Sequence, residues 1–274
     1  MKAFWLVLAL SAFGLRAEAS VRTLFPRSDE VFRQLLADPR QAQSVLRYYR
    51  LRGSNMADVA LGNTWGLLRW EPEEDLPGWV FQWSLEGLGY SRFLITGGIN
   101  EFHAIDFFAN VPLEFRKGAF SGNVMLFHES AHLGDDYFRR TGEAGVRYSV
   151  EGMRATLSYD LNPSVRVYGG GTGLMHGRPT GQGGAVQSGF ELRSPDLHWI
   201  KDHECWGYLA QDFLWHGRAY WRLASRTELG LRIGVPRVVR AMRAHIFHSA
   251  GHSAFGQFFR RKEYYCGLGL GFDF

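Results

Sequence analysis

The chain has 274 residues, of which 46% are hydrophobic and 15% aromatic, with 33 glycines, 9 prolines and a formal net charge of +4. Removal of residues 1–19 would take away two basic groups and one acidic group (+2 − 1 = +1), which leaves +3. That charge is too small and too scattered for a nucleic-acid-binding surface. High glycine and aromatic content with few long apolar runs is typical of a membrane β-barrel.

Residues 1–19 have the pattern of a signal peptide. Lys2 is followed by the apolar run Ala3–Leu15 and then by Arg16-Ala17-Glu18-Ala19, which contains an Ala-x-Ala cleavage motif. We therefore expect export and cleavage after Ala19. The alternative is an uncleaved anchor helix, but the apolar segment is shorter than the roughly 20 residues that a spanning helix needs.

Residues 20–42 are predicted to form a short periplasmic helical segment. Ser28-Asp29-Glu30 is typical of a helix start, and Asp38-Pro39 would end the helix. The apolar positions between them recur at helical spacing: Val31, Phe32, Leu35 and Leu36. Such a helix would pack under or against the mouth of a barrel, and a helix lying loosely on the surface is the alternative.

Residues 43–274 are predicted to form an all-β fold, a transmembrane antiparallel barrel of about 12 strands. Apolar and polar residues alternate along several segments, so one row faces lipid and the other the lumen. The candidate strands are 44–52, 57–70, 78–90, 102–116, 119–132, 146–160, 164–176, 183–193, 205–216, 219–234, 238–249 and 262–274. Residues 53–56 are short for an outer loop and 194–204 are long for a periplasmic turn, so ten or fourteen strands are alternatives.

The inward rows of these strands carry charges of both signs. They are Asp106, Glu114, Arg116, Arg154, Glu191, Arg193, Arg222, Arg226, Glu228 and Arg232. Long arginines paired with carboxylates would nearly fill a barrel of this size, which predicts a structural polar network. The alternative is a narrow pore or ligand site lined by arginines. The two cysteines, Cys205 and Cys266, lie three strands apart on this layout, so we expect them to be unbridged.

The last predicted strand alternates most clearly. Its apolar row is Tyr264, Cys266, Leu268, Leu270, Phe272 and Phe274. A soluble sheet would rarely end on such a stripe, because its edge would be exposed. The ending resembles the C-terminal strand of bacterial outer-membrane barrels, which typically finishes on Phe and serves as the assembly signal. The resemblance implies an outer-membrane location and insertion by the barrel assembly machinery.

Candidate catalytic residues lie where strand 119–132 enters an outer loop. His128 and Ser130 share the parity of apolar neighbours and are expected on the lipid-facing side, at the level of the outer leaflet. A histidine that accepts the proton of a serine hydroxyl is the minimal activated nucleophile, and it needs a third group to orient the imidazole. Glu143 and Glu151 are the candidates for that group, and His132 is a candidate for an assisting role.

The same outer loop carries candidate metal ligands. Asp135 and Asp136, with Glu129 or Glu143, have the carboxylate oxygens that Ca²⁺ prefers. Asp135 is alternatively an assistant to the catalytic histidine. A solvated acidic loop tip, or acids bridged to lipopolysaccharide through cations, is the competing explanation. Most of the chain's ten histidines are expected near the outer rim, but no pair has a decisive zinc spacing.

Two resemblances bear on function. The His128-x-Ser130 pair resembles that of outer-membrane lipid hydrolases such as outer-membrane phospholipase A and the lipid A deacylases, in which an Asn follows the Ser; here Ala131 replaces it. More of the chain is similar to an uncharacterised family of bacterial outer-membrane barrels. That similarity rests on Leu24-Phe25-Pro26, Leu36-Ala37-Asp38-Pro39-Arg40, the stretch from His128 to Tyr137 and the run Gly251–Phe258, which we expect to be a structured outer loop.

The leading hypothesis is therefore a hydrolase that acts on outer-membrane lipid or lipopolysaccharide. His128 would be the general base, Ser130 the nucleophile and Glu143 or Glu151 the orienting acid. No cofactor is certain, and Ca²⁺ is a candidate. The alternative is a non-enzymatic barrel, either a narrow channel or a structural or surface protein with a salt-bridged lumen.

Overall fold

A computed structural model describes residues 20–26, 31–72, 76–180, 183–236 and 240–273. The predicted signal peptide, residue Phe274 and part of the predicted helix start therefore lie outside the described residues. In the described part of the chain, no helix is long and apolar enough to cross a membrane.

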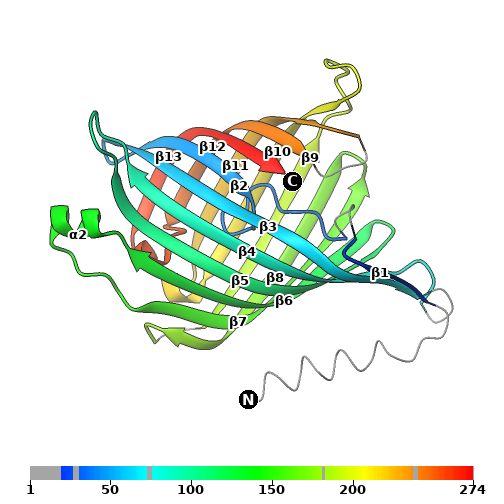
Figure 1. Ribbon diagram of the computed structural model, residues 1–274, viewed down its shortest axis with the longest axis horizontal. Coiled ribbons are helices and arrows are strands. Elements are labelled where there is room, and N and C mark those ends of the chain that lie inside the picture. Colours follow the sequence, from blue (N-terminus) through cyan, green and yellow to red (C-terminus); the bar gives the residue numbers. More distant parts are fainter. Residues whose placement is uncertain (1–19, 27–30, 73–75, 181–182, 237–239, 274) are drawn as a thin grey trace.

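Twelve antiparallel strands close into a barrel (Figure 1). They are β2 (Ser44–Leu51), β3 (Ser54–Pro72), β4 (Val80–Leu94), β5 (Glu101–Lys117), β6 (Phe120–Leu133), β7 (Tyr148–Asn162), β8 (Val165–Arg178), β9 (Gly184–Arg193), β10 (Glu204–His216), β11 (Arg222–Gly234), β12 (Ala241–His252) and β13 (Lys262–Asp273). Each strand pairs with its sequence neighbours, and β13 pairs with β2 to close the ring. The predicted all-β barrel of about 12 strands is confirmed.

The alternation of side chains sets the register of the strands. On β13, Leu268 is 62% exposed on the outer face, whereas a Cβ placed on Gly269 would lie 2.2 Å from the ring of His245 inside the barrel. A one-residue slip would turn the whole apolar row into the lumen, so the pairing is strongly specified. Cys205 on β10 and Cys266 on β13 lie three strands apart, and both are free thiols.

The N-terminal segment differs from its prediction. Ser20–Leu24 forms a strand, β1, that pairs with the end of β3 (Figure 1). Residues 31–43 contain turns but no helix. The expected amphipathic helix is therefore wrong over the described residues.

Residues 31–43 lie within the barrel and are stabilised by groups from its wall. Phe32 and Leu35 are buried against Tyr168 of β8. Glu191 accepts a hydrogen bond from the backbone N–H of Leu36, at 2.8 Å, and the Arg166 guanidinium donates to backbone carbonyls of the same segment. Because the wall satisfies these backbone groups, the segment can be buried without forming a helix. We call residues 31–43 the inner segment.

The end of the barrel away from β1 carries the short helix α2 (Asp135–Thr141) in the connection between β6 and β7 (Figure 1). We call this the outer end, because barrels of this class carry their longer loops outside. The connection between β12 and β13 contains the 3₁₀ turn η2 (Gly256–Phe258). Phe255 and Phe258 of this connection are buried, and Phe255 stacks on Tyr90 at 4.3 Å between ring centroids.

Candidate functional site

His128 and Ser130 lie on the outer face of β6, near its outer end. In the strand pairing, His128 lies between Ala109 of β5 and Glu151 of β7. Ser130 lies between Phe107 and Ser149 on the same two strands. Two residues along a strand span about 7 Å and share a face.

The clearest interaction of this site joins His128 to Glu151. The His128 Nδ1 atom lies 3.2 Å from Glu151 Oε1, and the two side chains are 45% and 51% exposed. Since a carboxylate accepts hydrogen bonds, the contact favours the tautomer with its proton on Nδ1 and leaves Nε2 available as a base. Among the described residues no hydrogen bond joins Ser130 to His128.

The other candidate acid, Glu143, contacts different groups. Its carboxylate forms an ion pair with Arg261 and accepts a hydrogen bond from the Tyr137 hydroxyl, at 3.3 Å. These contacts tie the β6–β7 connection to the β12–β13 connection. The structure therefore brings Glu151 to His128 and places Glu143 elsewhere.

His132 lies on the same outward-facing row of β6, two residues beyond Ser130. It is exposed, and its ring lies 6.2 Å from the ring of Phe107, in an edge-to-face arrangement. His132 thus borders the site on its apolar side, apart from the His128–Glu151 contact.

The sequence interpretation missed two neighbours on β8. His176 pairs with Glu151, and Arg178 pairs with Ser149, so both extend the cross-strand rows that contain His128 and Ser130. An irregularity between Glu151 and Gly152 shifts the register with β8. Sequence alternation does not reveal such a bulge, so the alignment of these residues with the site could not be foreseen.

One of the two predicted calcium ligands already has partners, and both lie at the start of a helix. Asp136 accepts a hydrogen bond from the backbone N–H of Phe102, at 3.0 Å, and forms an ion pair with Arg139, at 3.4 Å. Asp135 and Asp136 occupy the first turn of α2, where acids interact favourably with the helix dipole. No group of three His, Cys, Asp or Glu side chains that could hold a metal occurs among the described residues.

The lumen is filled by a charged network. Arg92 forms ion pairs with Asp58, at 3.1 Å, and with Glu263, at 2.8 Å. Arg226 forms one with Glu228, at 2.9 Å. All five side chains are buried. Pairing of this kind is what makes buried charges tolerable, and it agrees with the predicted structural network.

The inner segment joins the same network. Asp38 forms an ion pair with Arg154, and Arg40 forms one with Glu129. Burial would raise the pKa of the Asp38 carboxyl, but the charge and hydrogen bond of Arg154 outweigh burial and hold that pKa below its usual value.

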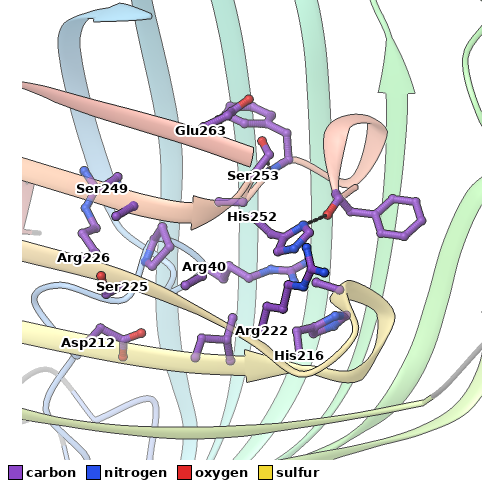
Figure 2. Close-up of a pocket in the computed structure, with 18 of the residues that line it drawn as sticks. Arg40, Asp212, His216, Arg222, Ser225, Arg226, Ser249, His252, Ser253 and Glu263 are labelled. Carbon is purple, nitrogen blue, oxygen red and sulfur yellow. Dashed lines mark hydrogen bonds between the residues drawn. The ribbon is translucent and has the colours of Figure 1, made fainter. Parts of the chain in front are cut away.

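Above the inner segment, a cavity of about 70 Å³ remains in the lumen (Figure 2). Side chains from the inner segment, from β10 to β12 and from the β12–β13 connection line this cavity, including Arg40, His216, Arg222, His252 and Ser253. The cavity lies inside the barrel, whereas His128 and Ser130 face outward.

A protein-family model matches residues 17–274 and carries the description "Protein of unknown function (DUF1207)". The chain belongs to the DUF1207 family. This confirms the resemblance to an uncharacterised family of barrels, and the description of DUF1207 names no activity. Among curated proteins, none matches this DUF1207 chain.

Solved outer-membrane barrels are similar to the DUF1207 chain in fold. The outer membrane phospholipase (OMPLA) dimer of Salmonella typhi with bound calcium has a TM-score of 0.56 and 11% identity, and the match covers 86% of this chain and 93% of that one. Outer membrane phospholipase A of Escherichia coli gives the same four values. The KdgM porin has a TM-score of 0.42 and 7% identity, with 85% and 99% covered. At such low identity the phospholipases support the fold alone, a closed antiparallel β-barrel.

Proposed function

We propose that this barrel is an outer-leaflet lipid hydrolase in which Ser130 is the nucleophile, His128 the general base and Glu151 the orienting acid. The observation that carries the proposal is the 3.2 Å contact between His128 and Glu151, beside a serine on the same outward face. Nucleophile, base and orienting acid are the three parts of a hydrolytic triad. Contacts between such groups are often loose in a protein without substrate, so a missing Ser130–His128 hydrogen bond does not argue against the assignment.

The proposed reaction is an acyl transfer to Ser130, followed by hydrolysis of the acyl-serine ester. Ser130 Oγ attacks the carbonyl carbon of a lipid ester while His128 Nε2 takes the hydroxyl proton, and Glu151 stabilises the imidazolium that forms. The imidazolium returns the proton to the departing alkoxide, which leaves as an alcohol, and an acyl group remains on Ser130. Water then attacks this ester with His128 again as base, which releases a fatty acid and restores the serine.

The surroundings favour a lipid substrate. Phe107 and Met153 are outward-facing neighbours of the site and are 48% and 45% exposed. On a membrane barrel such side chains contact acyl chains, so an ester at the boundary between chains and headgroups would lie near Ser130. Phospholipid and lipopolysaccharide are therefore the proposed substrates.

Calcium enters this proposal only as a variable of the assay. One fold relative was crystallised with calcium. In this chain, however, Asp136 is engaged by Phe102 and Arg139, and Glu151 by His128. The described residues contain no group of three His, Cys, Asp or Glu side chains that could hold the ion, and no step of the proposed reaction depends on it.

The test is release of fatty acid by the refolded barrel from phospholipid and from lipopolysaccharide, with and without Ca²⁺. Ser130→Ala should abolish release. Ser91→Ala, which changes another serine on the outer face near the same end, should leave it unchanged. If Ser130→Ala retains full activity, another nucleophile is responsible, and if the folded wild type releases nothing, the hydrolase proposal fails.

The second candidate is a non-enzymatic structural or surface barrel. It is favoured by the salt-bridged lumen and by the two segments that enter it, the inner segment and the β12–β13 connection. The same features argue against a wide channel. A folded barrel without lipase activity and without conductance would support this second candidate.

A further inference from the structure

The lumen cavity contains an excess of basic groups at its outer end. Arg40 and Arg222 line it together with His216 and His252 (Figure 2). His216 lies within electrostatic range of Arg40, Arg218 and His252, and His252 lies within range of Arg222. Five basic side chains therefore converge on one region, from the inner segment, β10, the β10–β11 connection, β11 and β12.

The carboxylates nearby form ion pairs with few of the arginines in this region. Glu129 forms an ion pair with Arg40. Within the described residues, neither Arg218 nor Arg222 forms an ion pair with a carboxylate. Asp212 and Glu263 also line the cavity, but Asp212 accepts hydrogen bonds from Tyr168 and Gln187, and Glu263 forms its ion pair with Arg92.

Two buried nitrogen atoms in this region have no hydrogen-bond partner among the described residues. One is Nη1 of Arg218, a side chain that is 8% exposed and lies over the rings of Tyr148 and Phe259, which line the cavity. The other is Nε2 of His252. Its ring is fixed from the opposite side, because Nδ1 lies 3.2 Å from the backbone carbonyl of Phe259 and must donate to it (Figure 2).

A buried guanidinium without a carboxylate partner, such as that of Arg218, is costly unless an anion compensates it. A cavity of about 70 Å³ exceeds the roughly 10–15 Å³ that one water needs, so it has room for a small polyatomic anion. We propose that this cavity binds a phosphate group, held by Arg222 and favoured by the positive charges of Arg218 and Arg40. Planar guanidinium groups are well suited to phosphate oxygens.

This site is independent of the proposed hydrolase, because it lies in the lumen. The phosphate could belong to a free solute that enters from the outer end or to a lipid headgroup. The cavity lies beside the η1 turn (Gly217–Ala219) and the β12–β13 connection, both at the outer end of the barrel. Entry from outside does not require the inner segment to move.

The test is calorimetry and thermal unfolding of the full refolded barrel in neutral detergent, with inorganic phosphate as the probe and chloride at matched ionic strength as the blank. A parallel sample contains anionic phospholipid in the micelles and no phosphate. We expect phosphate to bind in the millimolar range or tighter and to raise the unfolding temperature. Stabilisation by the lipid alone would identify a headgroup phosphate as the occupant.

The variant Arg222→Gln should weaken binding by roughly tenfold, the effect of losing one charge-assisted contact. Its matched control is Arg260→Gln, an exposed arginine of the neighbouring connection that does not line the cavity. Both side chains are exposed, so both variants should fold. No binding of either probe, or equal weakening in the two variants, would overturn the proposal.

Discussion

At the scale of single residues, the contact between His128 and Glu151 carries the functional argument. An exposed ion pair contributes little to stability, about 0–1 kcal/mol, so its value to the fold is small. Its geometry nevertheless fixes which imidazole nitrogen is a base, and that is a requirement of catalysis. The pair therefore predicts a large effect on turnover and a small effect on folding.

Glu151→Gln should lower the rate of fatty-acid release by roughly 10²- to 10⁴-fold, because the imidazole loses its preferred tautomer and the stabilisation of its charge. Glu143→Gln should leave the rate unchanged, because Glu143 contacts Arg261 and Tyr137 instead. Initial rates on micellar phospholipid, with the unfolding temperature as a folding control, distinguish the two acids. The reverse order of effects would assign the role to Glu143.

The sequence placed His128, Ser130 and Glu151 near one another because parity and strand order determine which residues face lipid side by side. It left Glu143 open as the acid, because the path of a loop depends on tertiary contacts such as the one to Arg261. It also missed the alignment of His176 and Arg178 with the site, because a bulge shifts their register without changing the pattern of residue types.

At the scale of elements, the inner segment shows why a helical pattern need not form a helix. Its apolar residues recur at helical spacing, but Phe32 and Leu35 find their partner in Tyr168 of the wall. Its backbone groups are satisfied by Arg166 and Glu191. Tertiary partners therefore override a weak local preference, which for a short helix is worth little by itself.

The Asp38–Arg154 pair makes the docking of this segment sensitive to acid. The folded-state pKa of Asp38 lies below its usual value, so its contribution to stability is complete above the unfolded pKa of about 4 and is lost as pH falls through the folded value. Asp38→Asn should destabilise the barrel at neutral pH by about 1.5–3 kcal/mol, since Arg154 loses its carboxylate partner and keeps only the hydrogen bond to Gln187. Unfolding in detergent across the pH range measures this; a destabilisation that persists unchanged in strong acid would contradict it.

The β12–β13 connection enters the lumen at a glycine. A Cβ on Gly256 would lie 2.7 Å from Cβ of Ala131 and 2.8 Å from the ring of Tyr148. The backbone N–H of Gly256 donates a hydrogen bond to the Asp106 carboxylate, at 2.7 Å. Gly256→Val should therefore displace the connection, at a cost of about 1–3 kcal/mol. Limited proteolysis should then cut residues 253–261 of the variant, whereas we expect the packed connection of the wild type to resist cleavage. Unchanged protection would contradict this packing.

At the scale of the whole molecule, the period-two pattern predicted the strands within a few residues of their observed ends. Every strand in the wall of a membrane barrel has one face toward lipid and one toward the lumen. The alternation of residue types therefore predicts each strand directly from the sequence. The filling of the lumen is different, because it depends on which distant side chains meet. Arg92, for example, pairs with Asp58 and with Glu263, which lies far along the chain.

The filled lumen predicts a low conductance. In planar bilayers the wild-type barrel should pass little current. Deletion of residues 20–43 should raise the current, because it removes the inner segment and exposes charged groups such as Arg154 and Glu191 to water. Equal currents from the two proteins would show that the inner segment does not block the lumen.

The central claim is tested most directly by covalent labelling of the folded barrel with a fluorophosphonate, which reacts with activated serines. The account predicts a single adduct on Ser130, found by mass spectrometry of the digested protein and lost in His128→Asn. A folded barrel that remains unlabelled, or that carries the adduct on another serine, would contradict the assignment of Ser130 as the nucleophile.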